Sequence, residues 1–231
     1  MAPLKTAILG ANGRISRILI QMLLANYKDR YTPIAVIRNP AQVDFFSELG
    51  VETRLADLTG SEGPIVDALT GVDVVVLTAG TSNGVAPGPE LLDHQGTRKV
   101  LAAMHATGVK RLVVIGGIKT DEYELIGRYF LKDYYIARKK ADDLIRAAKG
   151  IEYTLLRPGS LSNAPATGKV LGVENESDLS LDVVMSQSIT REDVAQAIIE
   201  SLESPNSIGK VIPLLNGEDK SLPDFISNFA A

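Results

Sequence analysis

The stretch Leu4-Lys5-Thr6-Ala7-Ile8-Leu9-Gly10-Ala11-Asn12-Gly13-Arg14-Ile15-Ser16 decides the fold of this chain. A short apolar run ends at Gly10, and a second glycine, Gly13, opens a segment with apolar residues at helical spacing. Glycine permits a tight turn and a close approach of the main chain to an anion, and the free N–H groups of the following helix attract negative charge. The third small position of the dinucleotide-binding fingerprint holds Ser16 in place of glycine. Alone, this stretch fits a dinucleotide site and an ordinary tight turn equally well.

The composition limits the classes of protein to which the chain can belong. Its 231 residues are 45% hydrophobic and 23% charged with a net charge of −4, which fits one sizeable domain. No basic cluster with interleaved aromatic residues occurs, so we expect no nucleic-acid partner. The lack of cysteine excludes disulfides and thiolate sites, and two histidines are too few for a histidine-rich metal site. No apolar run approaches the ~20 residues of a membrane span, so we expect a cytoplasmic protein without a membrane partner. We expect a monomer or a homodimer.

Strand-like and helix-like segments alternate along the whole chain, which is typical of a parallel sheet with helices on both faces. The sequence predicts strands at residues 6–9, 34–38, 51–56, 72–78, 111–115, 153–156, 183–189 and 210–215. It predicts helices after residue 13, from residue 40, and at residues 60–69, 91–107, 134–149 and 190–202. This order predicts one α/β domain over residues 1–231, a doubly wound parallel sheet or Rossmann fold. Residues 158–231 are expected to provide most of a small C-terminal cover on the substrate side.

Small or polar residues follow strand after strand in this pattern. They are Gly10, Arg38, Asp57, Thr78-Ala79-Gly80, Gly116-Gly117 and Arg157-Pro158-Gly159. In a doubly wound sheet, ligands bind beyond the carboxyl ends of the strands, near the point where the strand order reverses. This repetition favours a dinucleotide site over a bare turn.

Arg38 helps to choose the dinucleotide. An NAD-specific site needs an acid after the second strand to bind the ribose 2′-hydroxyl, and this chain has Arg38-Asn39 there, with Arg14 in the glycine turn. A guanidinium group suits a 2′-phosphate, because it is permanently charged and binds two oxygens at once. The sequence therefore predicts NADP as the cofactor, with NAD as the alternative.

The ordered motifs resemble the atypical short-chain dehydrogenase/reductase superfamily, in its NAD(P)-binding, NmrA-like and flavin-reductase-like branch. The matching segments are Gly10-Ala11-Asn12-Gly13, Val36-Ile37-Arg38, Ala56-Asp57-Leu58, Thr78-Ala79-Gly80, Tyr134, Ala141-Asp142-Asp143, residues 153–159 and residues 189–195. The resemblance implies that Asp57 and Leu58 flank the adenine, that Ala79 and Gly80 lie by the nicotinamide ribose, and that Pro158-Gly159 lie by the carboxamide. The candidate cofactor-binding residues are Gly10, Asn12, Gly13, Arg14, Ile15, Arg38, Asp57, Leu58, Thr78, Ala79, Gly80, Pro158 and Gly159.

In the family that the sequence resembles, the proton relay consists of a serine, a tyrosine and a lysine four residues after the tyrosine. Two registers exist here, Tyr134 with Arg138 and Tyr135 with Lys139. Tyr134 and Arg138 continue an apolar helical stripe, whereas Tyr135 shares a charged face that we expect to be solvated. We therefore take Tyr134 and Arg138 as the catalytic candidates, with arginine in place of lysine. The family serine falls on Gly116-Gly117, so two of the three relay members are changed.

An incomplete relay favours an acceptor that can collect its proton from water, such as a flavin or a quinone. Aromatic residues crowd the segment between the strand predicted at 111–115 and the early part of the helix predicted at 134–149, and these are Tyr123, Tyr129, Phe130, Tyr134 and Tyr135. They fit a flat or aromatic substrate, and they fit equally well a loop whose rings only pack onto the sheet. The sequence predicts an NADP-dependent oxidoreductase of a small conjugated or carbonyl acceptor. A cofactor-binding redox sensor without turnover is the main alternative. A sugar-nucleotide epimerase or dehydratase is a weaker one, because the chain is short for the larger C-terminal domain of those enzymes.

Three further expectations concern residues outside the cofactor pattern. His94 and His105 lack acidic or histidine partners at ligand spacing, so we expect structural or surface roles. Thr190, followed by Glu192 and Asp193, is typical of a helix N-cap. The acidic residues 174–182 are expected to form a solvated loop.

Overall fold

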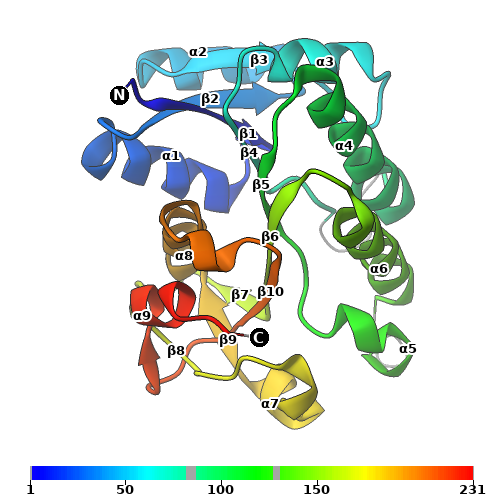
Figure 1. The fold of residues 1–231 in the computed structure, drawn as a ribbon, viewed down its shortest axis with the longest axis vertical. Helices are drawn as coiled ribbons and strands as arrows, with labels where there is room; N and C mark the ends of the chain where they lie inside the picture. Colours follow the sequence, from blue (N-terminus) through cyan, green and yellow to red (C-terminus); the bar gives the residue numbers. More distant parts are fainter. Residues whose placement is uncertain (1, 82–86, 127–130, 231) are drawn as a thin grey trace.

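A seven-stranded, fully parallel sheet forms the centre of the molecule in a computed structural model, which describes residues 2–81, 87–126 and 131–230. The strand order is β10-β6-β5-β4-β1-β2-β3, so the order reverses between β1 and β4 (Figure 1). The strands are β1 (Leu4–Leu9), β2 (Tyr31–Ile37), β3 (Glu52–Leu55), β4 (Val74–Leu77), β5 (Arg111–Ile115), β6 (Glu152–Pro158) and β10 (Lys210–Leu214). The predicted Rossmann fold is confirmed. All four residues of β4 are buried, as expected for a central strand with helices on both faces.

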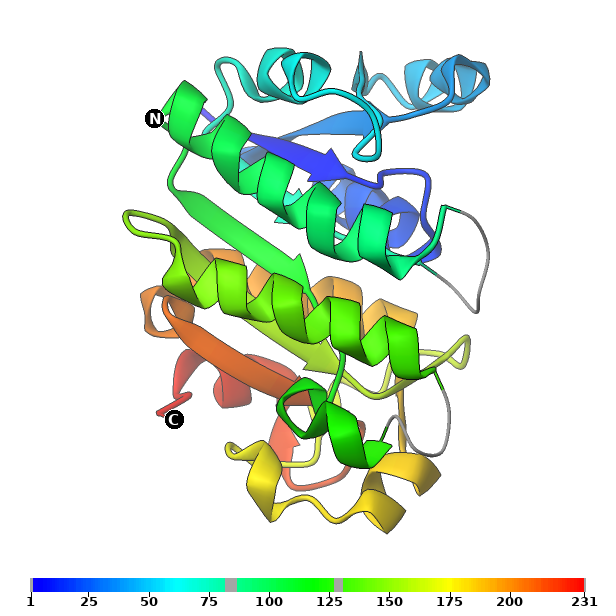
Figure 2. The same cartoon turned by 90° about the vertical axis from the view of Figure 1, so that its right-hand side faces the viewer.

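Helices cover both faces of this sheet. One face carries α1 (Arg14–Asn26), α2 (Val43–Glu48), α8 (Arg191–Glu203) and α9 (Leu222–Ser227). The other carries α3 (Gly63–Leu69), α4 (Gly96–Thr107) and α6 (Lys132–Ala147), of which α4 and α6 run side by side along the strands that they cover (Figure 2). A short helix (Pro40–Gln42) precedes α2, a π-helical turn (Glu90–Gln95) precedes α4, and a short helix (Pro205–Ser207) follows α8. Among the described residues, no helix combines the length and apolar character that a bilayer span demands.

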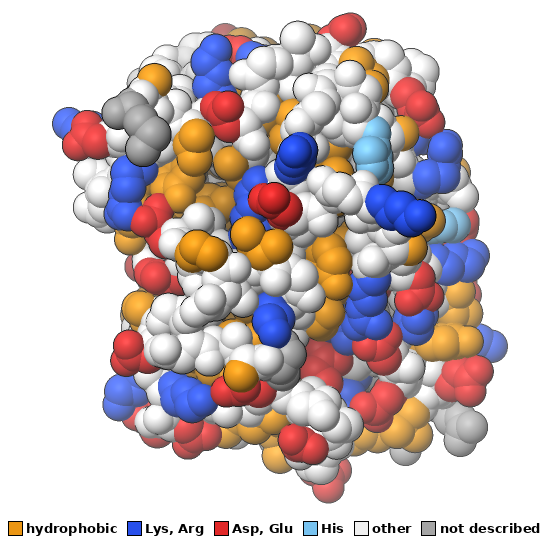
Figure 3. All heavy atoms as spheres, in the orientation of Figure 1, with side chains coloured by type: hydrophobic (Ala, Val, Ile, Leu, Met, Phe, Trp, Pro, Cys, Tyr) orange, Lys and Arg blue, Asp and Glu red, His pale blue; other side chains and the backbone are white. Residues whose placement is uncertain are grey.

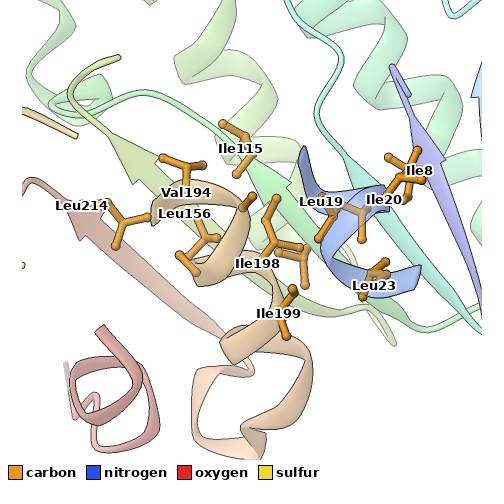
Figure 4. Packing of buried hydrophobic residues seen from close by; sticks show 14 of the residues in the cluster. Ile8, Leu19, Ile20, Leu23, Ile115, Leu156, Val194, Ile198, Ile199 and Leu214 are labelled. Carbon is orange, nitrogen blue, oxygen red and sulfur yellow. The ribbon is translucent and has the colours of Figure 1, made fainter. Parts of the chain in front are cut away.

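The core on the α1 face joins two helices that are far apart in sequence. Leu19, Ile20 and Leu23 of α1 pack with Val194, Ile198 and Ile199 of α8, over Ile8, Ile115, Leu156 and Leu214 of the sheet (Figure 4). All these side chains except Ile115 are fully buried. Each such residue stabilises the fold by about 1.5–3 kcal/mol relative to exposure. The two helices are therefore fixed next to each other.

Smaller elements gather beside the β6 and β10 edge of the sheet (Figure 1). They are β7 (Ser160–Ser162) paired with β9 (Ser188–Thr190), β8 (Lys169–Val170) paired with β11 (Lys220–Ser221), a short helix (Glu176–Asp178), α7 (Leu181–Ser186), a short helix (Thr120–Glu122) and α5 (Tyr123–Ile126). The strand predicted over residues 183–189 is wrong, because α7 occupies most of it. Ser180 Oγ accepts a hydrogen bond from the Val183 N–H, and this cap starts a helix despite the β-branched residues.

Candidate functional site

A cleft of about 300 Å³ lies beyond the carboxyl ends of β1, β2 and β4, at the reversal of strand order. Nine of the predicted cofactor-binding residues line it, namely Gly10, Asn12, Gly13, Arg38, Asp57, Leu58, Thr78, Ala79 and Gly80. Arg14 and Ile15 begin α1 directly after Gly13 but are not lining residues, and Pro158-Gly159 at the end of β6 lie apart from the cleft. The structure adds lining residues that the sequence reasoning missed, which are Gln42, Thr81, Pro87 and Leu92.

The glycine turn is shaped by a close approach of two main chains. Gly10 has a φ of +87°, and a Cβ there would lie 2.7 Å from the backbone nitrogen of Ala79. Only glycine fits this position, since both the backbone angle and the space exclude a side chain. Ser16 is fully buried, and its Oγ lies 2.6 Å from Thr78 Oγ1. The serine at the third fingerprint position therefore ties α1 to the end of β4.

The start of α1 presents unused backbone donors at the edge of the cleft. Its N-cap, Gly13, offers no side-chain hydrogen bond, and its first turn holds no acidic residue. By contrast, Ser180, Thr190 and Ser221 cap α7, α8 and α9, so the predicted Thr190 cap is confirmed. Free N–H groups and the positive helix end attract an anion. This arrangement fits the diphosphate of a dinucleotide.

Arg38 and Asp57 lie at the β2 and β3 end of the cleft, and both side chains are exposed. Asp57 Oδ1 accepts hydrogen bonds from the Thr59 N–H (2.9 Å) and Thr59 Oγ1 (2.8 Å). Partial burial acts to raise the pKa of Asp57, but these hydrogen bonds together with the charges of Arg38 and Lys99 hold it below its usual value. Asp57 thus remains an acceptor, and Arg38 forms no ion pair with a carboxylate of the described chain.

The opposite end of the cleft is backed by a buried ion pair. Arg138 Nη2 lies 2.9 Å from Asp93 Oδ1, and Arg138 Nη1 donates to the Ile115 carbonyl at 3.0 Å. Asp93 also accepts a hydrogen bond from Thr81 Oγ1 at 2.7 Å. A Cβ on Gly80 would lie 2.2 Å from Arg138 Nη2, so the guanidinium lies directly behind Gly80. Asp93 was not a sequence candidate, because nothing in its helical context signals a buried counter-ion.

Tyr134 lies next to this ion pair. The guanidinium carbon of Arg138 is 5.4 Å from the centroid of the Tyr134 ring, and Arg138 Nε is buried without a described hydrogen-bond partner. Burial acts to lower the pKa of Arg138, but Tyr134, Asp93 and Asp142 together raise it above its usual range. A Cβ on Gly117 would lie 3.3 Å from the Tyr134 hydroxyl. A serine at that position would therefore meet the phenol, and glycine leaves the space empty.

The prediction that Tyr135 faces solvent is wrong. Tyr135 is 6% exposed and packs with Ile118, Leu179, Val184 and Leu215, and burial is the main reason that its pKa rises to about 12. Helix α6 is covered on two sides, because Ile145 packs toward the sheet whereas Tyr135 packs under the C-terminal elements. Tyr123 and Tyr134 pack against the same cluster as Tyr135. Tyr129 and Phe130 lie outside the described residues.

A second buried ionic cluster surrounds Arg157, which is 1% exposed. Its guanidinium lies 2.6 Å from Asp142, 2.9 Å from Asp121 and 2.8 Å from Glu176. Burial raises the pKa of Asp142 and of Glu176, against the opposing charge of Arg157. The acidic residues 174–182 are thus not simply a solvated loop, since the Glu176 side chain is only 12% exposed. Thr120, the nearest hydroxyl after β5, donates to Asp142 at 2.8 Å.

The two histidines have structural partners, but the expectation that His94 lacks an acidic partner is wrong, because Glu90 lies four residues before it. His94 Nδ1 lies 2.8 Å from Glu90, and the His105 ring nitrogens lie 2.8 and 2.9 Å from the carbonyls of Leu101 and Lys149. Within residues 2–81, 87–126 and 131–230, no group of three or more His, Asp or Glu side chains is arranged to hold a metal ion. On the face drawn in Figure 3, acidic and basic side chains are interspersed.

Residues 10–205 match the model of a family described as NAD(P)H-binding, which covers most of the chain. The chain belongs to this NAD(P)H-binding family of atypical short-chain dehydrogenases/reductases. It is 37% identical over 227 residues to the UPF0659 protein YMR090W of Saccharomyces cerevisiae, covering 95% of this chain and 96% of the relative. It is 30% identical over 217 residues to quinone oxidoreductase 2 of Escherichia coli, covering 90% of this chain and 67% of that protein. A putative NAD-dependent epimerase/dehydratase from Bacillus halodurans superposes with a TM-score of 0.84 at 29% identity, covering 96% and 98% of the two chains.

The close contact behind Gly80 leads to a prediction for this family member. Gly80→Ala is expected to lower the free energy of unfolding by about 1–3 kcal/mol, because the new methyl group overlaps Arg138 Nη2 and overpacks the site. It is also expected to weaken NADPH binding, since Gly80 lines the cleft. Urea unfolding and fluorescence titration with NADPH measure the two effects. Gly63→Ala is the matched control, because a Cβ there meets nothing within 4 Å. Equal stability of the two variants would contradict the placement of Arg138.

Proposed function

We propose that the protein is an NADPH-dependent reductase that transfers hydride to a small, flat, conjugated acceptor of the quinone or flavin kind. The observation that carries the proposal is the cleft at the strand reversal, with the glycine turn at one side and Tyr134 with Arg138 behind the other. A bound nicotinamide would supply the hydride, and the protein would position the acceptor against it. The similarity to quinone oxidoreductase 2 supports the acceptor class.

The choice of NADP over NAD rests on Arg38. Its exposed guanidinium lines the cleft after β2, next to Asp57, and has no carboxylate partner among the described residues. Its charge already acts on Asp57, so a phosphate dianion bound there would meet a permanently charged, bidentate donor. We therefore assign Arg38 to the 2′-phosphate.

The preference for a quinone or flavin follows from the proton donors that the site offers. Arg138 is held by Asp93 and the Ile115 carbonyl behind Gly80, so its position differs from that of a free lysine that reaches a ribose. Gly116 and Gly117 provide no hydroxyl group, and Thr120 already donates to Asp142. Among the described residues, Tyr134 is the phenol whose ring lies beside the Arg138 guanidinium. Reduction of a quinone or flavin requires less of this relay than carbonyl reduction does, because the product can take its proton from water.

Oxidation of NADPH, followed at 340 nm with a panel of acceptors, tests the proposal. We expect turnover with menadione and riboflavin, and slower turnover with simple ketones and aldehydes. Tight NADPH binding without oxidation by any acceptor in the panel would contradict the proposal.

Replacement of Arg38 tests the cofactor assignment separately from turnover. Arg38→Ala is expected to weaken NADPH binding about 10- to 100-fold, because charge-assisted hydrogen bonds to the 2′-phosphate are lost. NADH binding should change by about two-fold or less, since NADH lacks that phosphate. The measurement is the Kd of each cofactor by fluorescence titration. Arg98→Ala is the control, because Arg98 is an exposed arginine that pairs with Glu62. An equal loss of affinity for NADPH and NADH would contradict the assignment of Arg38 to the 2′-phosphate.

A second candidate is a redox sensor that binds the cofactor without turnover. The change of two relay members, with Arg138 locked in an ion pair, favours this candidate. A sensor would bind a partner protein differently in the presence of NADP and of NADPH. An epimerase or dehydratase is a weaker third candidate. Its product would form without net oxidation of NADPH.

A further inference from the structure

A buried carboxylate joins the cofactor cleft to the helix that carries Tyr134. Asp93 is 1% exposed, and its two carboxylate oxygens hold different partners. Asp93 Oδ2 accepts hydrogen bonds from Thr81 Oγ1 at 2.7 Å and from the Thr81 N–H at 3.2 Å. Asp93 Oδ1 lies 2.9 Å from Arg138 Nη2. One side chain therefore contacts both the loop after β4 and helix α6.

The two partners of Asp93 belong to two different parts of the site. Thr81 lines the cleft directly after Gly80. Arg138 lies one helical turn after Tyr134 in α6, and its guanidinium carbon is 5.4 Å from the centroid of the Tyr134 ring. Two contacts, from Thr81 to Asp93 and from Asp93 to Arg138, thus connect the wall of the cleft to the helical turn that holds the phenol.

The packing around the ion pair makes this connection rigid. A Cβ on Gly80 would lie 3.1 Å from Asp93 Oδ1, and closer still to Arg138 Nη2, so the ion pair packs directly on the main chain of the cleft wall. Arg138 Nη1 also donates to the Ile115 carbonyl, at the end of β5, at 3.0 Å. Separation of a buried ion pair leaves each charge without its partner, which is strongly unfavourable. Asp93 and Arg138 therefore move together.

Asp93 lies in an unusual stretch of main chain. It belongs to the π-helical turn Glu90–Gln95, which precedes α4, and Thr97 Oγ1 donates to the Asp93 carbonyl at 2.6 Å. Such turns are rare and occur frequently at functional sites. Leu92, the residue before Asp93, lines the cleft. The turn thus places an apolar side chain in the cleft wall and the next side chain, a carboxylate, against α6.

A second ion pair joins the same turn to α6, but it is exposed. Glu90 Oε2 lies 3.0 Å from Lys140 Nζ, and both side chains are about half exposed. Glu90 also contacts His94 and Gln95, and these described residues lie outside the lining of the cleft. Water screens an exposed ion pair, so its contribution to stability is small. This pair provides a matched control for the buried one.

We propose that Asp93 is a positioning residue that couples the cofactor cleft to the first turns of α6, through Thr81 on one side and Arg138 on the other. A cofactor that orders Gly80 and Thr81 would thereby also fix the turn that carries Tyr134. The coupling does not depend on turnover. Its consequence for proton transfer by the phenol rests on the proposed reductase function.

Hydrogen–deuterium exchange, measured with and without saturating NADP, tests the coupling in the absence of an acceptor. In the unchanged protein, we expect the cofactor to slow exchange of the amides of residues 135–139 about five-fold or more, which is a usual strength of coupling between linked sites. Asp93→Asn keeps the shape of the side chain and removes the charge that holds Arg138. We expect the cofactor to slow these amides about two-fold or less in this variant.

Variants of Thr81 keep the test decisive, because Asp93→Asn leaves a buried charge unpaired and can fail to fold. Thr81→Val retains the ion pair and loses the 2.7 Å hydrogen bond, so the slowing should also fall to about two-fold or less. Thr81→Ser keeps the hydroxyl group and should restore the slowing. Glu90→Gln, which breaks the exposed ion pair, should retain the slowing in full.

Three results would overturn the assignment to Asp93. They are binding of NADP to the unchanged protein without slower exchange in α6, full slowing in Thr81→Val, and a loss in Glu90→Gln as large as that in Thr81→Val. Carbonyl reduction gives a second measurement, because Thr81→Val should slow it in the unchanged protein but not further in Tyr134→Phe. Equal slowing in both backgrounds would mean that Thr81 acts on the cofactor directly, against the proposal. If no acceptor is reduced, the reductase proposal fails, and the exchange measurement alone decides the coupling.

Discussion

Arg157→Met is expected to lower the free energy of unfolding by about 3–5 kcal/mol, because it leaves buried carboxylates without their counter-ion. The guanidinium of Arg157 is the shared partner of Asp142, Asp121 and Glu176, and it is almost fully buried. Methionine fills much of the same volume but supplies no charge and no hydrogen-bond donor. The expected loss is a large fraction of the stability of a domain of this size.

Chemical unfolding with urea measures this loss, and Asp142→Asn provides the comparison. Burial raises the pKa of Asp142, so its charge is already costly, and an amide of the same shape removes that cost. We therefore expect Asp142→Asn to destabilise the protein less than Arg157→Met does. The opposite order would show that Asp142, and not Arg157, is the centre of the cluster.

The same cluster predicts how the loss from Arg157→Met depends on pH. In the folded protein, burial already raises the pKa values of Asp142 and Glu176, and removal of Arg157 takes away a charge that opposes this rise. A carboxyl group with a raised folded-state pKa stabilises the fold below its unfolded pKa of about 4, and loses that contribution as the pH rises. The stability deficit of Arg157→Met should therefore grow from pH 5 to pH 8, in parallel unfolding curves of both proteins. A deficit that shrinks over this range would contradict the account.

The sequence pattern located the residues that line the cleft, but it did not locate the buried ion pairs, such as the one behind Gly80. Gly10, Arg38, Asp57 and Gly80 could be found because each follows a strand, and parallel strands end at one edge. Buried ion pairs cannot be found in this way, because their partners are far apart in sequence. Arg138 and Asp93, for instance, come from different helices, and each alone resembles a solvated charge.

The helical spacing of apolar residues predicted only one of the two buried faces of α6, for a related reason. A single apolar stripe predicts one buried face, but α6 is buried on the sheet side and also where Tyr135 packs with Leu179, Val184 and Leu215. Tyr135 was therefore assigned to solvent although it is buried, and Asp142 of the same helix is buried as well. The prediction that Arg138 lies on the buried face of α6 was nevertheless correct, because its guanidinium lies behind Gly80, which lines the cleft. A pattern within one helix carries no information about a second covering layer.

Tyr134→Phe is expected to slow the reduction of a ketone or aldehyde about 10²- to 10⁴-fold, because it removes the phenol that would donate the proton. Reduction of menadione and riboflavin should change by about two-fold or less, since these acceptors can take their proton from water. NADPH binding should be unaffected, because Tyr134 is not among the residues that line the cofactor cleft. The measurements are kcat and KM for each acceptor, with the Kd of NADPH determined separately.

Tyr135→Phe is the matched control, because it removes the same hydroxyl group one residue later. Tyr135 packs with Ile118, Leu179 and Val184, whereas the atoms nearest to a Cβ on Gly117 belong to Tyr134. Burial is the main reason that the pKa of Tyr135 is raised. This variant should lose stability without a selective loss of carbonyl reduction. If Tyr135→Phe instead slows carbonyl reduction and Tyr134→Phe does not, the proton donor is Tyr135 and the register with Lys139 is correct. If neither variant slows it, the phenols only pack, and the proton reaches the product from water for every acceptor.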